Sequence, residues 1–435
     1  MIRLGESLNV WRRRRLDDLQ QLAERFRDAS ERIARRADSS SWATVGNFSV
    51  PLFEHLLGVH KYSDPGAASL CTGAPIVGPF DGPDEWPVVD DAPRGWSQAE
   101  ILQADEEQRN SFLRTIRRSE HDQVLWDASM KDVADGRCAG PFDTADEVLN
   151  HLGTRRAAIS RWFGHAQGAQ VRPCDAMKRS CVNKGWAAHR RLRLSTTDSF
   201  CHTWRYTRVA ARKARVLHAA RAGSRRRPLR HHVHLKLWKH DLRDAYRQFP
   251  LRVDHHHLAV FTFAHPRTGR PVFFIHYVLM FGATGSVYSF NRISRAVVHI
   301  ARKHLFIPCD SYYDDFWALE LAETAQSGWA AFRALVEILG GRVKDEKAVA
   351  PTEHGDLLGA DVEVGGDPLV LRTKDERRAK IVARIDEALR TDQLAPADAG
   401  SLAGTCTFMS TTTFGKVGRK DASTSGSIRR ADPTS

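Results

Sequence analysis

Hydrophobic and polar residues alternate most regularly in the second half of the chain. Short β-rich runs at 235–239, 257–263 and 272–278 predict strands, and Pro266 and Gly269 predict a hairpin turn between the last two. Three later segments have the spacing of helices; they are residues 286–303, 325–339 and 373–395. A final strand is expected around Leu357-Leu358-Gly359. This order predicts a fold in which sheets and helices are mixed.

The first half of the chain has a weaker pattern. Apolar positions at helical spacing predict one amphipathic helix over residues 12–36, and the arginines at its start are expected to be solvated. An import signal or a phosphate contact is the alternative for these arginines. Residues 37–100 are rich in Ser, Gly, Pro and Asp and predict loops, whereas residues 96–146 predict helices that are broken at Gly140-Pro141. Short strands are expected at 160–164 and 171–175.

Acidic residues stand where two of the apolar runs end. The run that begins at Phe306 leads to Asp314-Asp315, and an apolar residue follows, which predicts a hairpin with carboxylates at its tip. Asp241 comes just after the strand predicted at 235–239. Two carboxylates delivered by two different strands are what a two-magnesium nucleotidyl-transfer site requires. The alternative is that each Asp is a turn residue or a surface charge.

We therefore identify Asp241 and Asp314 as candidate ligands shared by two Mg²⁺ ions, for which Mn²⁺ is a substitute. The backbone carbonyl of Leu242 could supply a further ligand. Asp315 is a third acid that would orient the neighbouring groups or neutralise charge. Magnesium keeps waters or phosphate oxygens in its octahedral shell, so two carboxylates and a bound substrate can complete it.

The charge of the chain suggests a class of partner. The 435 residues carry a net charge of +13 and have a pI near 9.6. A globular chain this basic usually meets a polyanion, so nucleic acid is expected first and a basic surface without such a partner second. The basic segment 208–234, which includes Arg225-Arg226-Arg227, either lines a nucleic-acid channel or forms a solvated loop.

Cysteines and apolar stretches bear on the compartment. The seven cysteines form no CxxC pair, which argues against a disulfide framework or a zinc ribbon and favours a reducing compartment. The N-terminus lacks the core of a signal peptide, and the most apolar stretch, 272–290, is interrupted by polar residues such as His276. We expect an intracellular protein of the cytoplasm or the nucleus that is neither secreted nor bound to a membrane.

Five motifs in order resemble those of the reverse transcriptases of eukaryotic retroelements, within residues 161–418. They are Asp241-x-x-x-Ala245-Tyr246-Arg247-Gln248, Phe281-Gly282-Ala283-Thr284-Gly285-Ser286 with Phe290-Asn291-Arg292, Tyr312-Tyr313-Asp314-Asp315, Gly340-Gly341-Arg342-Val343-Lys344-Asp345-Glu346-Lys347, and Leu357-Leu358-Gly359. The second motif, together with the late segment from Leu402 to Gly418, looks closest to DIRS-like elements or to reverse-transcriptase-like proteins abundant in some protist genomes.

The resemblance implies an α+β fold of the right-hand polymerase type. Residues 151–235 would be a fingers-like region, 236–365 the palm with an antiparallel sheet backed by helices, and 366–418 the start of a thumb. Residues 1–150 would be a helical or irregular N-terminal region of unknown role, and 419–435 a disordered tail.

The resemblance also implies an activity. The chain would be an RNA-directed DNA polymerase of a retrotransposon that adds deoxynucleotides to a primer by a two-magnesium mechanism. Its partners would be an RNA or DNA template with its primer, and deoxynucleoside triphosphates. The oligomeric state stays open.

The roles of the family's residues can be carried over to matching positions. Tyr246 would be the steric gate that excludes a 2′-hydroxyl, and Phe281 and Gly282 would lie beside the incoming nucleotide. Lys347 would assist the pyrophosphate leaving group, and Arg172 would grip the triphosphate through its planar fork. Leu358 and Gly359 would form the primer grip. The alternatives are a core aromatic for Tyr246, an ordinary exposed lysine for Lys347 and a surface arginine for Arg172.

Two departures from the family pattern keep other functions open. Met280 stands where the second motif usually has proline, and residues 165–170 lack the lysine that often precedes the fingers arginine. The missing lysine motivates a catalytically inactive, nucleic-acid-binding relic as one alternative. An RNA-directed RNA polymerase is another, against which the aromatic Tyr246 and the Tyr-x-Asp-Asp sequence argue.

Overall fold

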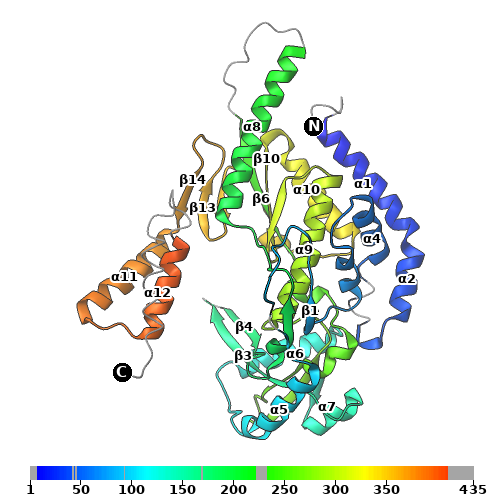
Figure 1. Ribbon diagram of the computed structural model, residues 1–435, viewed down its shortest axis with the longest axis vertical. Coiled ribbons are helices and arrows are strands. Elements are labelled where there is room, and N and C mark those ends of the chain that lie inside the picture. Colours follow the sequence, from blue (N-terminus) through cyan, green and yellow to red (C-terminus); the bar gives the residue numbers. More distant parts are fainter. Residues whose placement is uncertain are drawn as a thin grey trace.

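The computed structural model describes residues 7–41, 44, 47–92, 94–167, 170–221 and 233–409. Within these residues the strands form four sheets, and helices pack around them (Figure 1). The predicted mixture of sheets and helices is confirmed. The assignment of segments to fingers, palm and thumb stays a prediction.

A four-stranded antiparallel sheet lies at the centre of the molecule. Its order is β11–β6–β10–β9, with β6 (Leu235–Asp241), β9 (Cys309–Tyr312), β10 (Asp315–Leu321) and β11 (Val349–Thr352). β6 and β10 pair along their whole length, from Leu235 opposite Leu321 to Asp241 opposite Asp315. The strand predicted at 235–239 and the acidic hairpin are therefore present.

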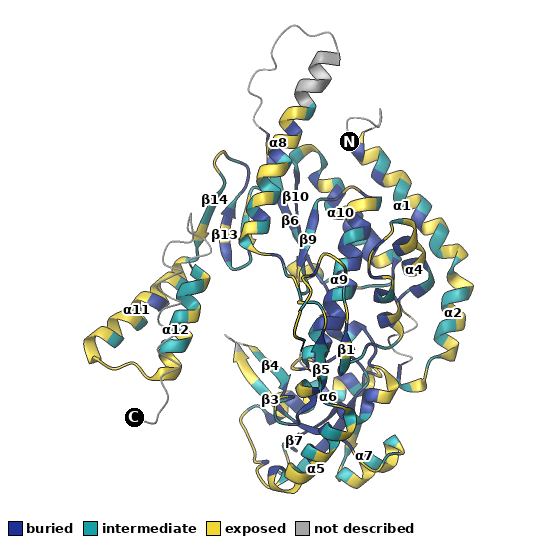
Figure 2. Ribbon diagram, in the orientation of Figure 1, coloured by how far each residue is buried: buried dark blue, intermediate teal, exposed yellow. Residues whose placement is uncertain are grey.

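The two faces of this central sheet are covered by different layers, because alternate side chains of a strand point to opposite sides. On one face, Trp238 and Phe316 contact Phe332 of α10 (Ala322–Ile338). On the other face, Trp317 contacts Phe200 of α8 (Thr197–Arg221). Figure 2 shows that buried residues gather in β6, β9, β10 and α9 (Thr284–His304).

Helices surround the sheets over most of the described chain. They are α1 (Leu8–Arg25), α2 (Arg27–Arg36), α4 (Val50–Val59), α5 (Gln98–Leu113), α6 (Asp122–Ala134), α7 (Ala145–Leu152), α8 (Thr197–Arg221), α9 (Thr284–His304), α10 (Ala322–Ile338), α11 (Asp375–Thr391) and α12 (Pro396–Met409). The helices predicted at 286–303, 325–339 and 373–395 correspond to α9, α10 and α11. Among the described residues, none of the helices is both long and apolar enough to span a membrane.

A five-stranded sheet lies at the lower end of the view, beside α5, α6 and α7 (Figure 1). Its order is β2–β8–β7–β3–β4, with β2 (Cys138–Phe142), β3 (Ile159–Gln167), β4 (Gln170–Asp175), β7 (Val260–Ala264) and β8 (Pro271–His276). The strands predicted at 160–164 and 171–175 and the predicted hairpin are therefore present. This sheet takes strands from both sides of the predicted boundaries after residues 150 and 235, which stay predictions.

Two smaller sheets complete the strands. One is antiparallel, with β12 (His354–Leu357), β13 (Ala360–Glu363) and β14 (Val370–Thr373), and the other pairs β1 (Gly78–Phe80) with β5 (Trp186–Ala188) in parallel. The expected strand around Leu357-Leu358-Gly359 is corrected: β12 ends at Leu357, and Leu358 and Gly359 form the turn to β13. Both turn residues have positive φ, +52° and +76°, as a two-residue hairpin requires.

Several predictions for the first half were wrong. The single helix expected over 12–36 is divided at Phe26 into α1 and α2. The loop region 37–100 contains α4, and β2 lies within the region 96–146 that was expected to be helical. Arg12 is not solvated but 1% exposed. The first part of the basic segment 208–234 belongs to α8, whereas Arg225-Arg226-Arg227 and the predicted tail 419–435 lie outside the described residues.

Candidate active site

The turn between β9 and β10 places carboxylates at the end of the central sheet. Tyr312 pairs with Asp315, so Tyr313 and Asp314 form a two-residue turn. Tyr313 has a φ of +54°, the left-handed conformation that tight hairpins favour. Asp315 in turn lies opposite Asp241 of β6. The register of the sheet therefore brings together the three acids predicted from the sequence.

Backbone hydrogen bonds fix the strand end that carries Asp241. The N–H of Leu242 donates to the carbonyl of Asp314 at 3.4 Å, and the N–H of Lys344 donates to the carbonyl of Asp241 at 2.8 Å. The carbonyl of Leu242, the predicted further ligand, accepts the N–H of Ala245 at 3.4 Å. Because a carbonyl oxygen has two lone pairs, it retains one for another partner.

Gln248 joins the two loops that flank Asp241. Its Nε2 donates to the carbonyl of Arg243 at 2.7 Å, and its Oε1 accepts the N–H of Arg342 at 2.7 Å. The motif at 241–248 and the motif at 340–347 are thereby held side by side. From the sequence, Gln248 was predicted only as part of a motif, without a role of its own.

The acids share a neighbouring ammonium group. Nζ of Lys347 lies 2.6 Å from Oδ2 of Asp241, and the hydrogen bond between them raises the pKa of Lys347. Burial raises the pKa of Asp314, and the charge of Asp241 adds to the rise. Burial likewise raises the pKa of Asp315. Burial and like charge both disfavour the ionised carboxylates, and a bound cation would offset both effects.

The donor atoms of this site suit magnesium. Carboxylate and carbonyl oxygens are the hard ligands that Mg²⁺ prefers. Within the described residues, no group of three or more His, Cys, Asp and Glu side chains is placed to hold a single ion. An ion here would therefore take one or two carboxylates from the chain and complete its shell with water or substrate oxygens, as magnesium commonly does.

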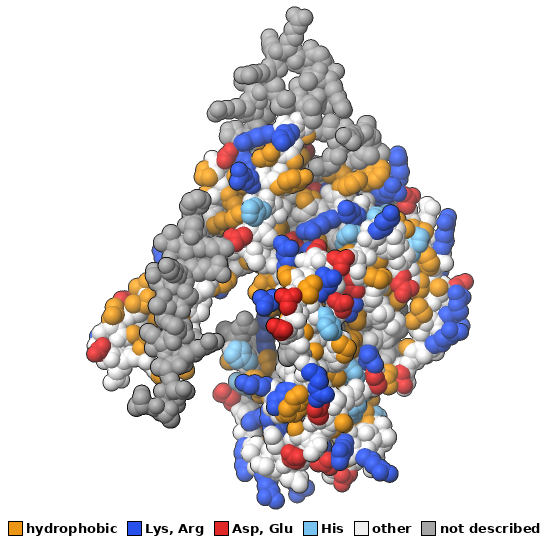
Figure 3. Space-filling view, viewed as in Figure 1, with side chains coloured by type: hydrophobic (Ala, Val, Ile, Leu, Met, Phe, Trp, Pro, Cys, Tyr) orange, Lys and Arg blue, Asp and Glu red, His pale blue; other side chains and the backbone are white. Residues whose placement is uncertain are grey.

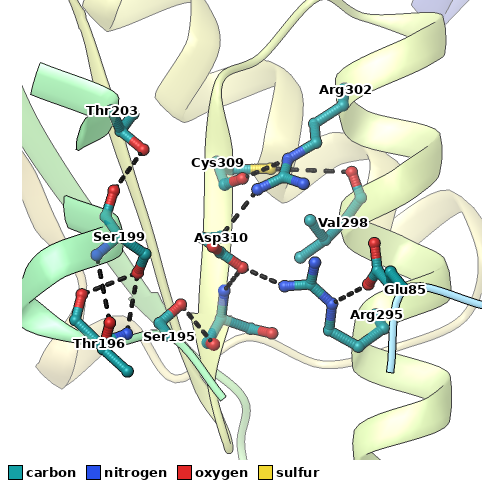
Figure 4. Close-up of polar contacts among 11 residues, drawn as sticks. Glu85, Ser195, Thr196, Ser199, Thr203, Arg295, Val298, Arg302, Cys309 and Asp310 are labelled. Carbon is teal, nitrogen blue, oxygen red and sulfur yellow. Dashed lines mark hydrogen bonds and ion pairs between the residues drawn. The ribbon is translucent and has the colours of Figure 1, made fainter. Parts of the chain in front are cut away.

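An ion-pair network anchors the hairpin to the helix behind it (Figure 4). Asp310 of β9 pairs with Arg295 and, at 3.4 Å, with Arg302 of α9. Arg302 also donates to the carbonyl of Cys309 at 2.7 Å, while Arg295 bonds Glu85 at 2.8 Å. The strand that ends in the acidic turn is thus fixed from one side. The sequence pattern predicted the helix that carries these arginines but gave them no role.

Lys239 extends the charged end of the sheet. Its Nζ donates to the carbonyl of Asp356 at 3.1 Å, and its charge opposes the rise in the pKa of Asp315 that burial causes. Lys239 was not predicted as a site residue. Its place two residues before Asp241, on the same face of the strand, was the available signal.

Tyr246 packs beneath an exposed aromatic ring. It lies on the short 3₁₀ helix Ala245–Gln248 and is buried. Its ring meets Phe281 edge-on at 5.0 Å between centroids and Phe290 at 4.6 Å. Phe281 is 42% exposed. Burial, followed by the charge of Asp314, raises the pKa of Tyr246, so the hydroxyl stays neutral near the acids.

The backbone of Phe281 and Gly282 is held by residues of the 170–185 segment. The N–H of Asp175 donates to the carbonyl of Phe281 at 3.3 Å, and Nδ2 of Asn183 donates to the carbonyl of Gly282 at 2.9 Å. Oδ1 of Asn183 accepts the N–H of Thr284 at 2.8 Å. These contacts join the two predicted nucleotide-binding segments.

Three buried polar side chains tie β4 to β8 and β2. Oδ1 of Asp175 lies 3.2 Å from Nε2 of His276, and Sγ of Cys138 lies 3.3 Å from Nδ1 of the same ring. A thiol, an imidazole and a carboxylate in this order resemble a hydrolytic triad. However, burial raises the pKa of Cys138, and all three side chains are closed to substrate. We therefore assign them a structural role.

The remaining predicted residues lie on other sheets. Arg172 is exposed on β4, opposite His165 of β3. Leu358 and Gly359 form the turn of the β12–β13 hairpin, where Arg377 of α11 donates to the carbonyl of Gly359 at 3.4 Å. The roles predicted for these three residues stay predictions.

Comparison with known proteins gives little more. No protein-family model and no curated protein matches the chain. Among solved structures, a foamy viral protease-reverse transcriptase in complex with double-stranded DNA matches with a TM-score of 0.41 and 13% identity. The match covers 65% of this chain and 40% of that one. At this TM-score and identity, it carries no argument about the activity of the present chain.

Proposed function

We propose that the chain is an RNA-directed DNA polymerase of a retrotransposon, which extends a primer with deoxynucleotides. The observation that carries the proposal is the meeting of Asp241, Asp314 and Asp315 at one end of an antiparallel sheet. The order of the five sequence motifs supports the same conclusion.

In this proposal Asp241 and Asp314 hold the metal ions, and the carbonyl of Leu242 adds an oxygen. Bound Mg²⁺ would supply activation of the primer hydroxyl and binding of the triphosphate. Asp315 orients or neutralises, and Lys347, already charged beside Asp241, is placed to assist the leaving pyrophosphate. Arg172 binds the triphosphate through its guanidinium group.

Tyr246 would select deoxynucleotides. Its ring is fixed between Phe281 and Phe290, so it cannot easily move away from a sugar placed over it. In wild type we expect deoxynucleotides to be used and ribonucleotides rejected, and Tyr246→Ala to relax that rejection. The Tyr246→Phe variant keeps the ring and is the matched control. Equal discrimination in all three proteins would contradict the gate and reopen the RNA polymerase alternative.

The test is primer extension on a primed RNA template with deoxynucleotides and magnesium, beside an Asp314→Asn control. Extension by wild type that the control abolishes is the expected result. If neither protein extends the primer while both still bind the template, the chain is a nucleic-acid-binding relic instead.

A further inference from the structure

Helix α8 presents an exposed face that the candidate active site does not use. Its inward side packs on the central sheet, where Phe200 meets Trp317 at 5.4 Å between ring centroids. Its outward residues are His202, Arg205, Tyr206, Val209, Arg212 and Lys213. The ring of Tyr206 is 76% exposed. An aromatic ring in water among basic side chains is available for stacking against a base.

Basic residues outnumber acidic ones on this face. The sequence of α8 contains one acidic residue, Asp198, which lies in the first turn of the helix. Arg205 and Lys213 are both exposed, and Arg212 is exposed while it pairs with Asp367 at 2.8 Å. Figure 3 shows basic, histidine and hydrophobic side chains over this part of the molecule, with a few acidic ones among them. A polyanion is the partner that such a face would attract.

The helix begins beside the acidic hairpin and extends away from it. Oγ of Ser195, just before α8, donates to the carbonyl of Ser311 in β9 at 2.8 Å. With a rise of about 1.5 Å per residue, Tyr206 lies about 14 Å along the helix from Thr197. A nucleic-acid strand that extends from the candidate active site along α8 would therefore meet the basic side chains and the aromatic ring.

Basic side chains and an exposed ring together favour a single strand over a duplex. Unpaired bases stack on aromatic side chains, whereas the bases of a duplex are already stacked on one another. Val209, one turn after Tyr206, adds apolar surface beside the ring. We propose that the outward face of α8 binds single-stranded nucleic acid, with Tyr206 against a base and with Arg205 and Lys213 against phosphates.

The experiment measures binding of the full chain to a labelled oligothymidylate of about 20 nucleotides, longer than a typical single-strand site. Because it is done in EDTA over a range of salt concentrations, it needs no polymerase activity, and failure of the proposed function would leave it unaffected. Tyr206→Ala should weaken binding about tenfold, whereas Tyr206→Phe should not. The Arg205→Ala/Lys213→Ala variant should lower the salt slope by about 1.4, or about 0.7 for each lost phosphate contact.

Arg35→Ala is the matched control, because Arg35 is also exposed but lies on α2, away from α8. It should leave both the affinity and the salt slope close to those of wild type. All replaced residues are exposed, so the variants should unfold at the wild-type temperature. Wild-type binding by Tyr206→Ala would overturn the proposal. The proposal would also be overturned if Tyr206→Ala lost as much affinity for a duplex of the same length as for the single strand, because a duplex offers no unpaired base to the ring.

Discussion

Gly282 occupies a position that no other residue fits without strain. Its φ is +101°, and a Cβ atom there would overlap the backbone oxygen of Asp175. Glycine alone tolerates both demands. The contact is so close because the loop beside Phe281 lies directly against the end of β4, the strand that carries Arg172. One small residue thus sets the spacing between two predicted nucleotide-binding segments.

Gly282→Ala should therefore push this loop away from β4. We expect the KM for deoxynucleotides to rise about tenfold and the free energy of unfolding to fall by about 1–3 kcal/mol, the usual cost of such backbone strain. Steady-state kinetics and denaturant unfolding measure the two effects. Gly404→Ala on α12 is the control, since nothing lies within 4 Å of its added methyl group. Equal KM values and equal unfolding free energies for the two variants would show that the close contact between Gly282 and Asp175 does not matter.

At the scale of elements, α1 is joined to the central sheet through one buried side chain. Arg12 donates to Oε2 of Glu320 on β10 at 2.7 Å, to the carbonyl of Leu305 at 3.0 Å and to that of Thr324 at 2.9 Å. Trp238 of β6 donates to the other oxygen of the same carboxylate at 3.1 Å. A buried charge that is paired on all sides tolerates little change.

Arg12→Leu should leave Glu320 buried without its charge partner. The expected loss is about 3–5 kcal/mol of unfolding free energy, measured by urea denaturation. Arg13→Ala, at the exposed neighbouring position, should change stability by less than about 0.5 kcal/mol. If Arg12→Leu were equally mild, α1 would be held to the body by its apolar contacts alone.

The order of elements from residue 235 onward could be predicted because each strand and helix has its own periodicity and its own turn residues. The helix α4 was missed although Leu52, Phe53, Leu56 and Leu57 have helical spacing, because Ser- and Gly-rich segments surround it. The strand β2 was missed because Gly140-Pro141 lies inside it. In both cases the packing partner, which is distant in sequence, decides the structure.

The site could be predicted only in part for a related reason. Asp241 and Asp314 stand next to apolar runs, so sequence order alone suggested that two strands deliver them. The polar partners around them are far apart in the chain: Gln248 and Arg342, which join the loops beside Asp241, are 94 residues apart, and Arg295 and Glu85 are 210 apart. A single sequence carries no signal that pairs such polar residues.

For the molecule as a whole, buried histidines make stability depend on pH. Burial lowers the pKa of His255 and of His256 to about 4, whereas an unfolded chain has a histidine pKa near 6.5. Nδ1 of His255 accepts the N–H of Ile76 at 3.1 Å, which requires a neutral ring. The stabilising contribution is therefore fully present above about pH 6.5 and is lost as the pH falls towards 4.

His255→Asn should reduce this loss, because the Asn oxygen can still accept the N–H of Ile76 but does not titrate in this range. We expect the unfolding free energy of the variant to fall less steeply with decreasing pH than that of wild type. The difference between the two slopes should be at most about 1.4 kcal/mol per pH unit, the value for one proton. Denaturant unfolding between pH 7 and pH 4.5 measures the slope. His202→Asn, on the exposed face of α8, should leave the slope unchanged. The raised pKa values of Asp314 and Asp315 act in the opposite sense in every variant, so they cancel in the comparison.

The ion pair between Lys347 and Asp241 gives the molecule a tethered counter-ion. The lysine side chain is 51% exposed, so it can swing into solvent while the carboxylate stays in place. A divalent ion that arrives at Asp241 must displace this cation, much as ions exchange on a charged resin.

Lys347→Met should accordingly gain more thermal stability from magnesium than wild type gains, and it should start from a lower unfolding temperature in EDTA. Lys344→Met, three residues earlier on the same loop, should follow wild type. If the unfolding temperatures of Lys347→Met and wild type depended identically on magnesium concentration, the lysine would not compete with the ion. If Lys347 does compete, the magnesium concentration that half fills the proposed site would reflect competition between two cations for one carboxylate. A substitution in the loop 342–347 would then change that concentration while Asp241, Asp314 and Asp315 stay intact.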